Sequence, residues 1–179
     1  ELEPVFLAGT TVSRATLHNA EEVERKDIRE GDTVILEKGG DVIPKVVEVV
    51  EAERPDRTVE FTFPTTCPVC YGALVKDAGE VAIRCINPRC PAQLKGNIRH
   101  FASRTAMDIE GLGIALVNQL VDSGLVCDVG DLYSLEIDSV AGLERMASRS
   151  AENLLNALEE SKSRPFHQLL FALGIRHVG

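Results

Sequence analysis

The chain has 179 residues, of which 44% are hydrophobic, and its formal net charge is −9. This composition shows no strong bias towards disorder, supplies enough apolar side chains for one ordinary core or several small ones, and selects no fold class by itself. No apolar run approaches the roughly 18 residues that a membrane-spanning helix needs, and nothing resembles a signal peptide, so we expect a soluble intracellular protein with reduced thiols and no membrane partner.

Charge is distributed unevenly along the chain. Residues 1–64 carry 8 Lys and Arg against 15 Asp and Glu, residues 65–104 carry 6 against 2, and residues 105–179 carry 5 against 11. An acidic total usually argues against a polyanion partner, but a surface acts through charge within a Debye length, about 8 Å at physiological salt. The stretch from Arg84 to Arg104 holds five cations and no acidic residue. It is therefore a candidate for contact with a polyanion.

Residues 1–64 have the pattern of β-structure. Runs rich in Val, Ile, Thr and Leu predict short strands, and two of them, around residues 32–38 and 41–50, are joined across Gly39-Gly40 as in a hairpin. Asn19, followed three residues later by Glu22, predicts the start of one short helix between the strands. Several short strands with one inserted helix indicate a small all-β barrel, closed or nearly closed.

Four cysteines stand in two spaced pairs: Cys67, Cys70, Cys85 and Cys90. Their spacing, Cys-x2-Cys-x14-Cys-x4-Cys, is typical of a tetrahedral four-thiolate zinc site, and such a site has no open position for water, so the ion would be structural. The alternative is four reduced core cysteines, but these do not usually occur in two spaced pairs flanked by prolines. Cys127 stands alone, and we expect it to be a small apolar filler.

The pattern becomes helical from residue 91 onward. Apolar residues recur at i, i+4 and i+7 as Leu94, Ile98 and Phe101, and further stripes predict short helices over the rest of the chain. Lys95 and Arg99 share a neighbouring face of the first helix. They are candidates for a polyanion surface, and a solvated helix face is the alternative.

Two glycines mark a second motif. Gly111 and Gly113 enclose an apolar residue just before an amphipathic helix, which is the arrangement of a helix-hairpin-helix. Glycine permits positive φ and leaves no Cβ, so the backbone can approach a phosphate, and the N–H groups that begin the next helix point at it. An ordinary helix C-cap also uses glycine, so one such turn is weak evidence.

Repetition of the format strengthens the interpretation. The last residues repeat it with Gly174 and Gly179 on either side of a segment that contains Arg176. A middle turn has Arg145 and Ala147 where glycines are expected, so we expect it to have lost close phosphate contact. Because neutral N–H groups do the binding, such a domain can hold DNA while its side chains sum to a negative charge.

In combination and order, these stretches resemble the bacterial NAD-dependent DNA ligases. The strings LEPVFLAGTTVSRATLHNAEEV and GDTVILEKGGDVIPKVVEVV are similar to the family's OB-fold domain. CPVC with RCINPRCPAQLKGNIRHFASRTAMDIEGLG is similar to its zinc finger and first hairpin, and SAENLLNALEESK and FALGIRHVG to later hairpin parts. The resemblance implies a multidomain chain: an OB-fold over 1–64, a four-cysteine zinc finger over 65–93, and an all-α helix-hairpin-helix domain over 94–179, truncated at its C-terminus.

The resemblance also implies nick sealing in duplex DNA during replication and repair. In the family a lysine is adenylated from NAD, AMP passes to the 5′-phosphate at a nick, and the 3′-hydroxyl displaces AMP, with Mg in the intact enzyme. The family's Lys-x-Asp-Gly does not occur here; the nearest string is Lys76-Asp77-Ala78-Gly79. We therefore expect an excised fragment that contains no catalytic residue and is inactive without its own adenylation domain. It is expected to be a monomer in the bacterial cytoplasm with one structural zinc.

Carried over by position, the family's DNA contacts fall on eight residues: Arg14, Lys95, Arg99, Gly111, Gly113, Gly174, Arg176 and Gly179. For Arg14 the alternative is an ordinary exposed strand residue. Two rival functions stay open from sequence. One is a stand-alone, non-catalytic DNA-binding scaffold, and the other is a zinc-organised protein-interaction module with no role on DNA.

Overall fold

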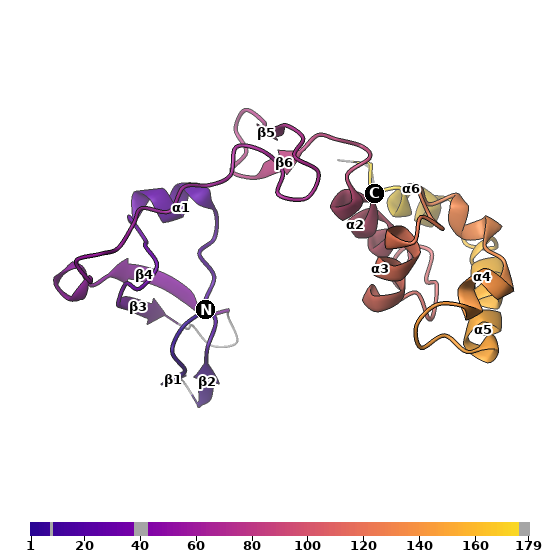
Figure 1. The fold of residues 1–179 in the computed structure, drawn as a ribbon, viewed down its shortest axis with the longest axis horizontal. Helices are drawn as coiled ribbons and strands as arrows, with labels where there is room; N and C mark the ends of the chain where they lie inside the picture. Colours follow the sequence, from indigo (N-terminus) through magenta and orange to yellow (C-terminus); the bar gives the residue numbers. More distant parts are fainter. Residues whose placement is uncertain (8, 38–42, 176–179) are drawn as a thin grey trace. The chain divides into compact units, whose positions relative to one another are not determined.

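A computed structural model describes residues 1–7, 9–37 and 43–175 (Figure 1). The chain divides into two compact units. The N-terminal unit comprises Glu1–Cys67 with Ala73–Arg84, and the C-terminal unit comprises Pro68–Gly72 with Cys85–Gly179. Within the described ranges, no helix has both the length and the apolar character to cross a membrane.

The N-terminal unit is built from short antiparallel ribbons. β1 (Val5–Leu7) pairs with β2 (Thr10–Val12), and β3 (Val34–Glu37) pairs with β4 (Lys45–Val49). The predicted hairpin is confirmed in the pairing of β3 with β4, although its expected Gly39-Gly40 turn lies outside the described residues. The register shifts between Ile35 and Leu36, where Val47 of β4 is left without a partner in β3, so β4 is bulged.

The predicted helix is α1 (Ala20–Arg25), and its start is explained by local chemistry. The Asn19 side chain accepts a hydrogen bond from the Glu22 N–H at 2.9 Å, which satisfies one of the N–H groups left free in a first helical turn. At the other end, the Lys26 ammonium donates to the carbonyl of Val46 at 2.7 Å. The helix is thereby tied to β4.

A closed all-β barrel does not appear in the described part of this unit. The strands are three to five residues long and pair only two by two; the third ribbon is β5 (Leu74–Lys76) with β6 (Ile83–Cys85). Beyond these ribbons, isolated bridges join Thr16 to Lys45 and Arg29 to Glu60, so β4 meets the chain on both sides, but through a single residue pair on one of them. The buried apolar residues outside the cysteine cluster are few: Val12, Val23, Val46 and Val49.

An ion-pair cluster, Asp27, Arg29, Asp32 and Arg54, compensates for this small core. Arg54 donates to Asp32 through Nε at 2.9 Å and through a second nitrogen at 3.0 Å, and it also donates to Asp27 at 2.6 Å. The Asp32 side chain is only 1% exposed. The cluster joins residues 27–32, which follow α1, to Arg54, which follows the short 3₁₀ helix η1 (Glu51–Glu53).

The C-terminal unit has only helices as regular elements within residues 91–175. They are α2 (Pro91–Phe101), α3 (Ile114–Asp122), η2 (Asp131–Ser134), α4 (Ile137–Ala141), α5 (Ser148–Ser161) and α6 (Phe166–Ala172). Ile98 and Phe101 of α2 are buried and Leu94 packs partly buried against the same core, so the predicted stripe is confirmed. The helices enclose one contiguous apolar core, in which Leu120, Leu132 and Leu154 are among the fully buried side chains.

Candidate metal centre and nucleic-acid interface

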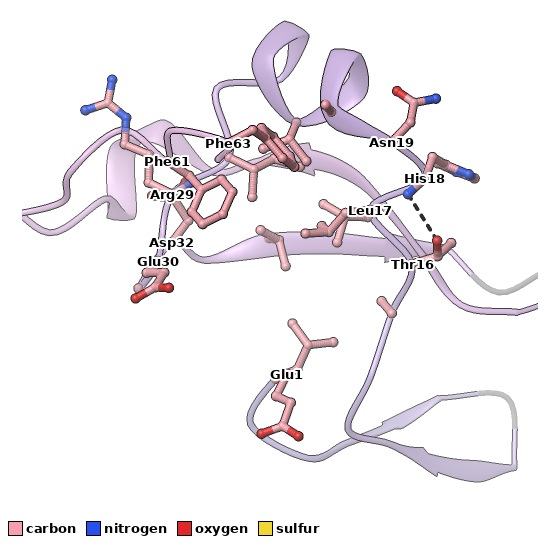
Figure 2. A pocket seen from close by; sticks show the side chains of 18 residues that line it. Glu1, Thr16, Leu17, His18, Asn19, Arg29, Glu30, Asp32, Phe61 and Phe63 are labelled. Atoms are coloured by element: carbon pink, nitrogen blue, oxygen red, sulfur yellow. Dashed lines mark hydrogen bonds between the residues drawn. The ribbon is translucent and has the colours of Figure 1, made fainter. Parts of the chain in front are cut away.

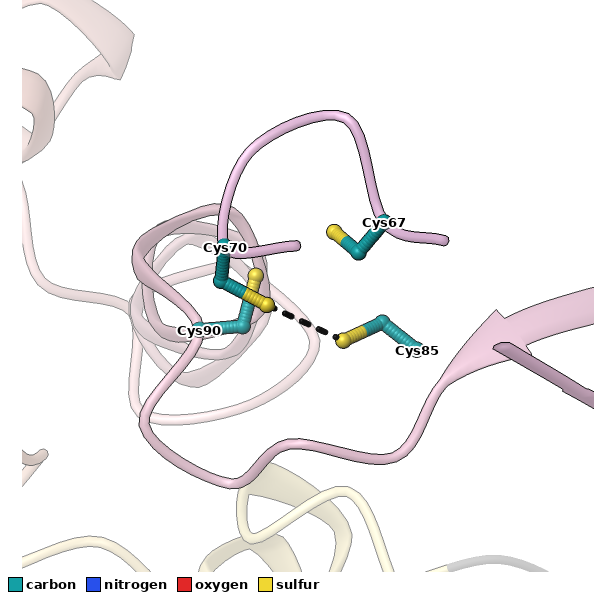
Figure 3. Close-up of side chains that lie close together, drawn as sticks. All are labelled: Cys67, Cys70, Cys85 and Cys90. Atoms are coloured by element: carbon teal, nitrogen blue, oxygen red, sulfur yellow. Dashed lines mark hydrogen bonds between the residues drawn. The ribbon is translucent and has the colours of Figure 1, made fainter. Parts of the chain in front are cut away.

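The four paired cysteines converge (Figure 3). Their sulfur atoms all lie within 4.8 Å of one another, and the Sγ atoms of Cys70 and Cys85 are 3.5 Å apart. Cys85 ends β6, and Cys90 directly precedes α2 as its N-cap residue. The Asn87 N–H points to the Cys85 sulfur at 3.4 Å, and the Asn87 carbonyl accepts from the Cys90 N–H at 3.1 Å. The turn between the second pair is therefore shaped around the sulfurs.

This arrangement fits a zinc ion. Four thiolates at about 2.3 Å from a tetrahedral centre would lie about 3.8 Å from one another, which falls between the 3.5 Å separating Cys70 from Cys85 and the 4.8 Å within which all four sulfurs lie. The donor set is all sulfur, which suits zinc, and it leaves no position for substrate. The N–H of Asn87 directed at a sulfur favours the thiolate form that a metal requires. The centre can hold structure together, and its ligands leave no place for metal catalysis.

Cys127 stands apart from this cluster, and the expectation that it fills a core is wrong. It is exposed, because the loop after α3 is held by Asp131, whose carboxylate accepts hydrogen bonds from the N–H groups of Cys127 and Asp128. That carboxylate fixes the backbone of the loop, and the Cys127 thiol donates to the Gly124 carbonyl at 3.8 Å. The lone cysteine therefore serves as a natural control for the four that converge.

The turn at Gly111 and Gly113 is open on its outer side. Gly111 has φ +86°, and Gly113 is the N-cap of α3 with an extended backbone at φ −79°. Between them Leu112 is buried in the helical core. A Cβ added to either glycine would meet nothing within 4 Å in the described part of the chain. Packing within the chain therefore does not require Gly113, and the missing side chain leaves room for a group from outside.

The middle turn has the same backbone without the glycines. Arg145 adopts φ +62°, Ala147 is the extended N-cap of α5, and Met146 packs against the core. Gln119 of α3 holds this turn: its amide donates to the Glu144 carbonyl at 3.2 Å and accepts from the Glu144 N–H at 2.7 Å. Nothing in the sequence predicted this contact. No local signal marks it, because its partners are 25 residues apart.

The predicted cationic residues differ in their surroundings. Lys95 pairs with Asp122 of α3 at 2.7 Å, so much of its charge is offset within the helical unit. Arg14 pairs with Glu1 at 3.1 Å, but both side chains are 80% exposed, and such a pair is weak. Arg99 is exposed and has no ion pair among the described residues.

The last predicted turn is described only in part. Gly174 follows α6 with φ +63°, and a Cβ there would lie 3.5 Å from Cδ2 of His100. The His100 ring in turn makes a hydrogen bond with the Phe171 carbonyl at 2.8 Å, another contact that no pattern in the sequence predicted. The predicted contacts at Arg176 and Gly179 lie outside the described residues.

The N-terminal unit also contains a cavity of about 570 Å³, which no pattern in the sequence predicted (Figure 2). Phe61 and Phe63 lie on one side in edge-to-face contact, with ring centroids 4.8 Å apart. His18 stands at the rim in a left-handed backbone conformation, φ 63°, and its N–H donates to the Thr16 hydroxyl at 3.0 Å. The lining is mixed, with apolar side chains beside the polar groups of residues 16–19 and 29–32.

Comparison with known families follows the same order along the chain. The NAD-dependent DNA ligase OB-fold domain matches residues 1–58, and the NAD-dependent DNA ligase C4 zinc finger domain matches residues 66–92. The second match contains all four converging cysteines. Both domain models that match this chain describe NAD-dependent DNA ligases.

Relatives agree with this assignment over the full chain. Proteins named DNA ligase from Chlorobaculum tepidum, Saccharophagus degradans and Synechococcus are 58%, 54% and 51% identical to it, in each case over all of this chain. The chain spans about a quarter of the length of these curated relatives, 26–27%. The two matched domains therefore lie in a chain that is much shorter than the DNA ligases to which it is similar.

Proposed function

We propose that this chain is the DNA-binding part of an NAD-dependent ligase that seals nicks in duplex DNA. The observation that carries the proposal is the order of the two matched domains together with the four sulfurs that converge within the second. In the whole protein, a lysine elsewhere would take AMP from NAD and pass it to the 5′-phosphate at the nick, with Mg. This chain would supply binding and no nucleophile.

The helical unit is proposed to bind the sugar–phosphate backbone as a helix-hairpin-helix domain over residues 94–179, following an OB-fold over 1–64 and a zinc finger over 65–93. The open turn at Gly111 and Gly113 supports this, because its glycines face outward and α3 begins directly behind them. N–H groups at such a turn favour an anion. The exposed guanidinium of Arg99 and the turn at Gly174 are proposed to add contacts.

The metal centre is proposed to hold one structural zinc through four thiolates. Its role is to order a segment in which few side chains are buried, since the binding free energy of structural zinc, on the order of 10–16 kcal/mol in small peptides, then contributes directly to folding. The protein is proposed to work as a monomer on nicked DNA in the bacterial cytoplasm, in replication and repair.

The test is a titration of the zinc-loaded chain against fluorescein-labelled nicked duplex, followed by anisotropy at several salt concentrations. Phosphate contacts release counterions, so log K should fall linearly with log salt. Tighter binding to nicked than to intact duplex would support the ligase assignment. Binding that ignores salt, or no binding at low salt, would contradict the proposal and favour a protein-interaction module.

A further inference from the structure

The zinc finger exposes large apolar side chains next to its metal cluster. Tyr71 directly follows the ligand Cys70 and is 79% exposed, while Val69 is 50% and Ile86 61% exposed. The Tyr71 hydroxyl has no hydrogen-bond partner in the part of the chain that the structure describes. This set, Val69, Tyr71 and Ile86, is called the finger tip below. None of its members contributes to the apolar core of the helical unit.

Close packing around the sulfurs explains why the finger tip faces outward. A Cβ on Gly72 would lie 3.2 Å from the Cys70 sulfur and 3.3 Å from the Asn87 Cβ. The backbone of the first cysteine pair therefore lies against that of the second pair. Tyr71 and Ile86, which directly precede Gly72 and Asn87, are the neighbours left in solvent.

The backbone at Tyr71 would suit a glycine better than a tyrosine. Its φ is +57°, in the left-handed region that glycine enters without strain and a bulky side chain enters at a cost. The ring repays none of this cost through packing, because it is exposed. Strained residues with no structural return concentrate at functional sites. The fold thus accounts for the backbone conformation but does not account for the ring.

The charge around the finger tip identifies its partner. Arg89, in the second cysteine pair, is exposed and has no ion pair among the described residues. No acidic residue occurs between Arg84 and Arg104. The zinc finger thus carries both an exposed ring and an exposed guanidinium, and the stretch from residue 84 to 104 has no carboxylate. Proteins hold nucleic acid with this pair of groups, since a ring contacts bases while a cation contacts phosphate.

We infer that the finger tip contacts nicked duplex DNA, with the Tyr71 ring packed against the bases and sugars beside the nick and Arg89 on a neighbouring phosphate. The inference rests on the proposed function and adds to it a contact surface on the zinc finger itself. It makes Tyr71 a binding residue in a segment whose cysteines serve only structure.

The test compares variants of the zinc-loaded chain for binding to fluorescein-labelled nicked duplex. Tyr71→Gly should weaken binding at least about fivefold, the lower end of the loss expected for one stacked ring. It should keep one zinc per chain and melt no lower than the parent, because glycine suits the positive φ. Tyr71→Phe should bind within about twofold of the parent. Phe166→Ala, which removes a ring of similar exposure from α6, is the matched control and should leave affinity unchanged.

A second readout observes Tyr71 directly. The chain has no Trp and two Tyr, so in a Tyr133→Phe variant Tyr71 is the sole tyrosine, and unlabelled nicked duplex should quench its emission. Unchanged affinity of Tyr71→Gly, or unquenched emission, overturns the inference even if the parent chain binds DNA and the proposed function stands. If the parent does not bind nicked duplex at low salt, the proposed function and the inference fall together.

Discussion

Cys85 shows how one residue can decide whether a segment is ordered. It delivers its sulfur from the end of β6 to within 3.5 Å of Cys70, and the Asn87 N–H supports it. We expect Cys85→Ser to lower zinc from one per chain to well below half, because the remaining three thiolates leave the site incomplete. Zinc released by a thiol reagent and measured with a colorimetric chelator checks this.

Cys127→Ser is the matched control for that substitution. Cys127 is exposed and lies outside the cluster, so its loss should leave zinc content and the thermal midpoint unchanged. If Cys85→Ser retained a full equivalent of zinc, or if both variants lost it, the assignment of the four converging cysteines as the ligands would be wrong.

Gly113 separates stability from binding at a single position. Its backbone is extended and a Cβ there meets nothing within 4 Å in the described chain, so Gly113→Val should change the thermal midpoint by no more than about 4 °C. A branched side chain at the start of α3 should nevertheless keep a phosphate away from the N–H groups, and we expect affinity for nicked duplex to fall about tenfold.

Ala147→Val is the comparison for Gly113→Val, since Ala147 holds the same N-cap position before α5 and already has a Cβ. Its effect on affinity should be much smaller. Equal losses from the two substitutions in anisotropy titrations would show that the valine disturbs helix starts in general, and the argument for close backbone approach at Gly113 would fail.

Among the elements of the N-terminal unit, the ion-pair cluster supplies stability that the small apolar core does not. The pKa of Asp27 is lowered to about 2, first by the hydrogen bond from Arg29 and then by the one from Arg54. Burial raises the pKa of Asp32, but hydrogen bonds from Arg54 and from the Arg29 N–H outweigh it and the net shift is downward. Both carboxylates therefore prefer the charged form in the folded chain.

The sign of the pH dependence follows from these shifts. A carboxylate whose pKa is lower in the folded chain stabilises the fold above its unfolded value, near 3.8, and this contribution is lost as pH falls towards about 2. Arg54→Met should lower the thermal midpoint of the N-terminal unit at pH 7 by at least about 4 °C, because Asp32 is left buried without its partner.

The difference in unfolding free energy between the parent and Arg54→Met should then shrink between pH 4 and pH 2. Urea unfolding followed by circular dichroism measures this free energy at each pH, and loss of zinc in acid affects both proteins alike. Arg57→Met, which removes a nearby exposed arginine with no ion pair in the described part of the chain, should match the parent throughout. A constant gap across this range would contradict the role assigned to the carboxylates.

The same elements show what sequence could and could not predict. The Asn19 cap, the stripe along α2 and the two cysteine pairs depend on residues close in sequence or on strict spacing, and each of these is present as expected. Contacts from Arg54 to Asp27 and from Gln119 to Glu144 join residues 27 and 25 positions apart and leave no local trace. The expected barrel closure also depends on long-range pairing, and strands as short as three residues do not predict which strands will pair.

For the chain as a whole, a net charge of −9 is compatible with a DNA partner because some cations of the basic stretch, Arg84 to Arg104, have no ion pair among the described residues. In the basic stretch, Arg84 pairs with Glu80 and Lys95 pairs with Asp122. The other cations of this stretch are exposed and have no ion pair among the described residues: Arg89, Arg99 and Arg104. Three arginines and an open backbone turn are a modest footprint, so log K of the isolated chain should fall with log salt with a slope of only about −3.

In the proposed ligase this chain binds the nick, while another part of the whole protein carries the nucleophile. The chain has no Lys-x-Asp-Gly string, so alone it should form no phosphodiester bond at a nick. Mixed with the purified adenylation domain of a relative, NAD and Mg, it should raise sealing above either part alone. The rate should grow with the concentration of the added chain, because a covalent linker normally supplies an effective concentration in the millimolar range. Denaturing gels of labelled nicked duplex measure the product.

The Cys127→Ser chain should support sealing as the parent does, whereas Cys85→Ser and Gly113→Val should support little. Sealing by the chain alone would mean that it contains a nucleophile of its own, and equal sealing with every variant would mean that it contributes nothing to holding the nick.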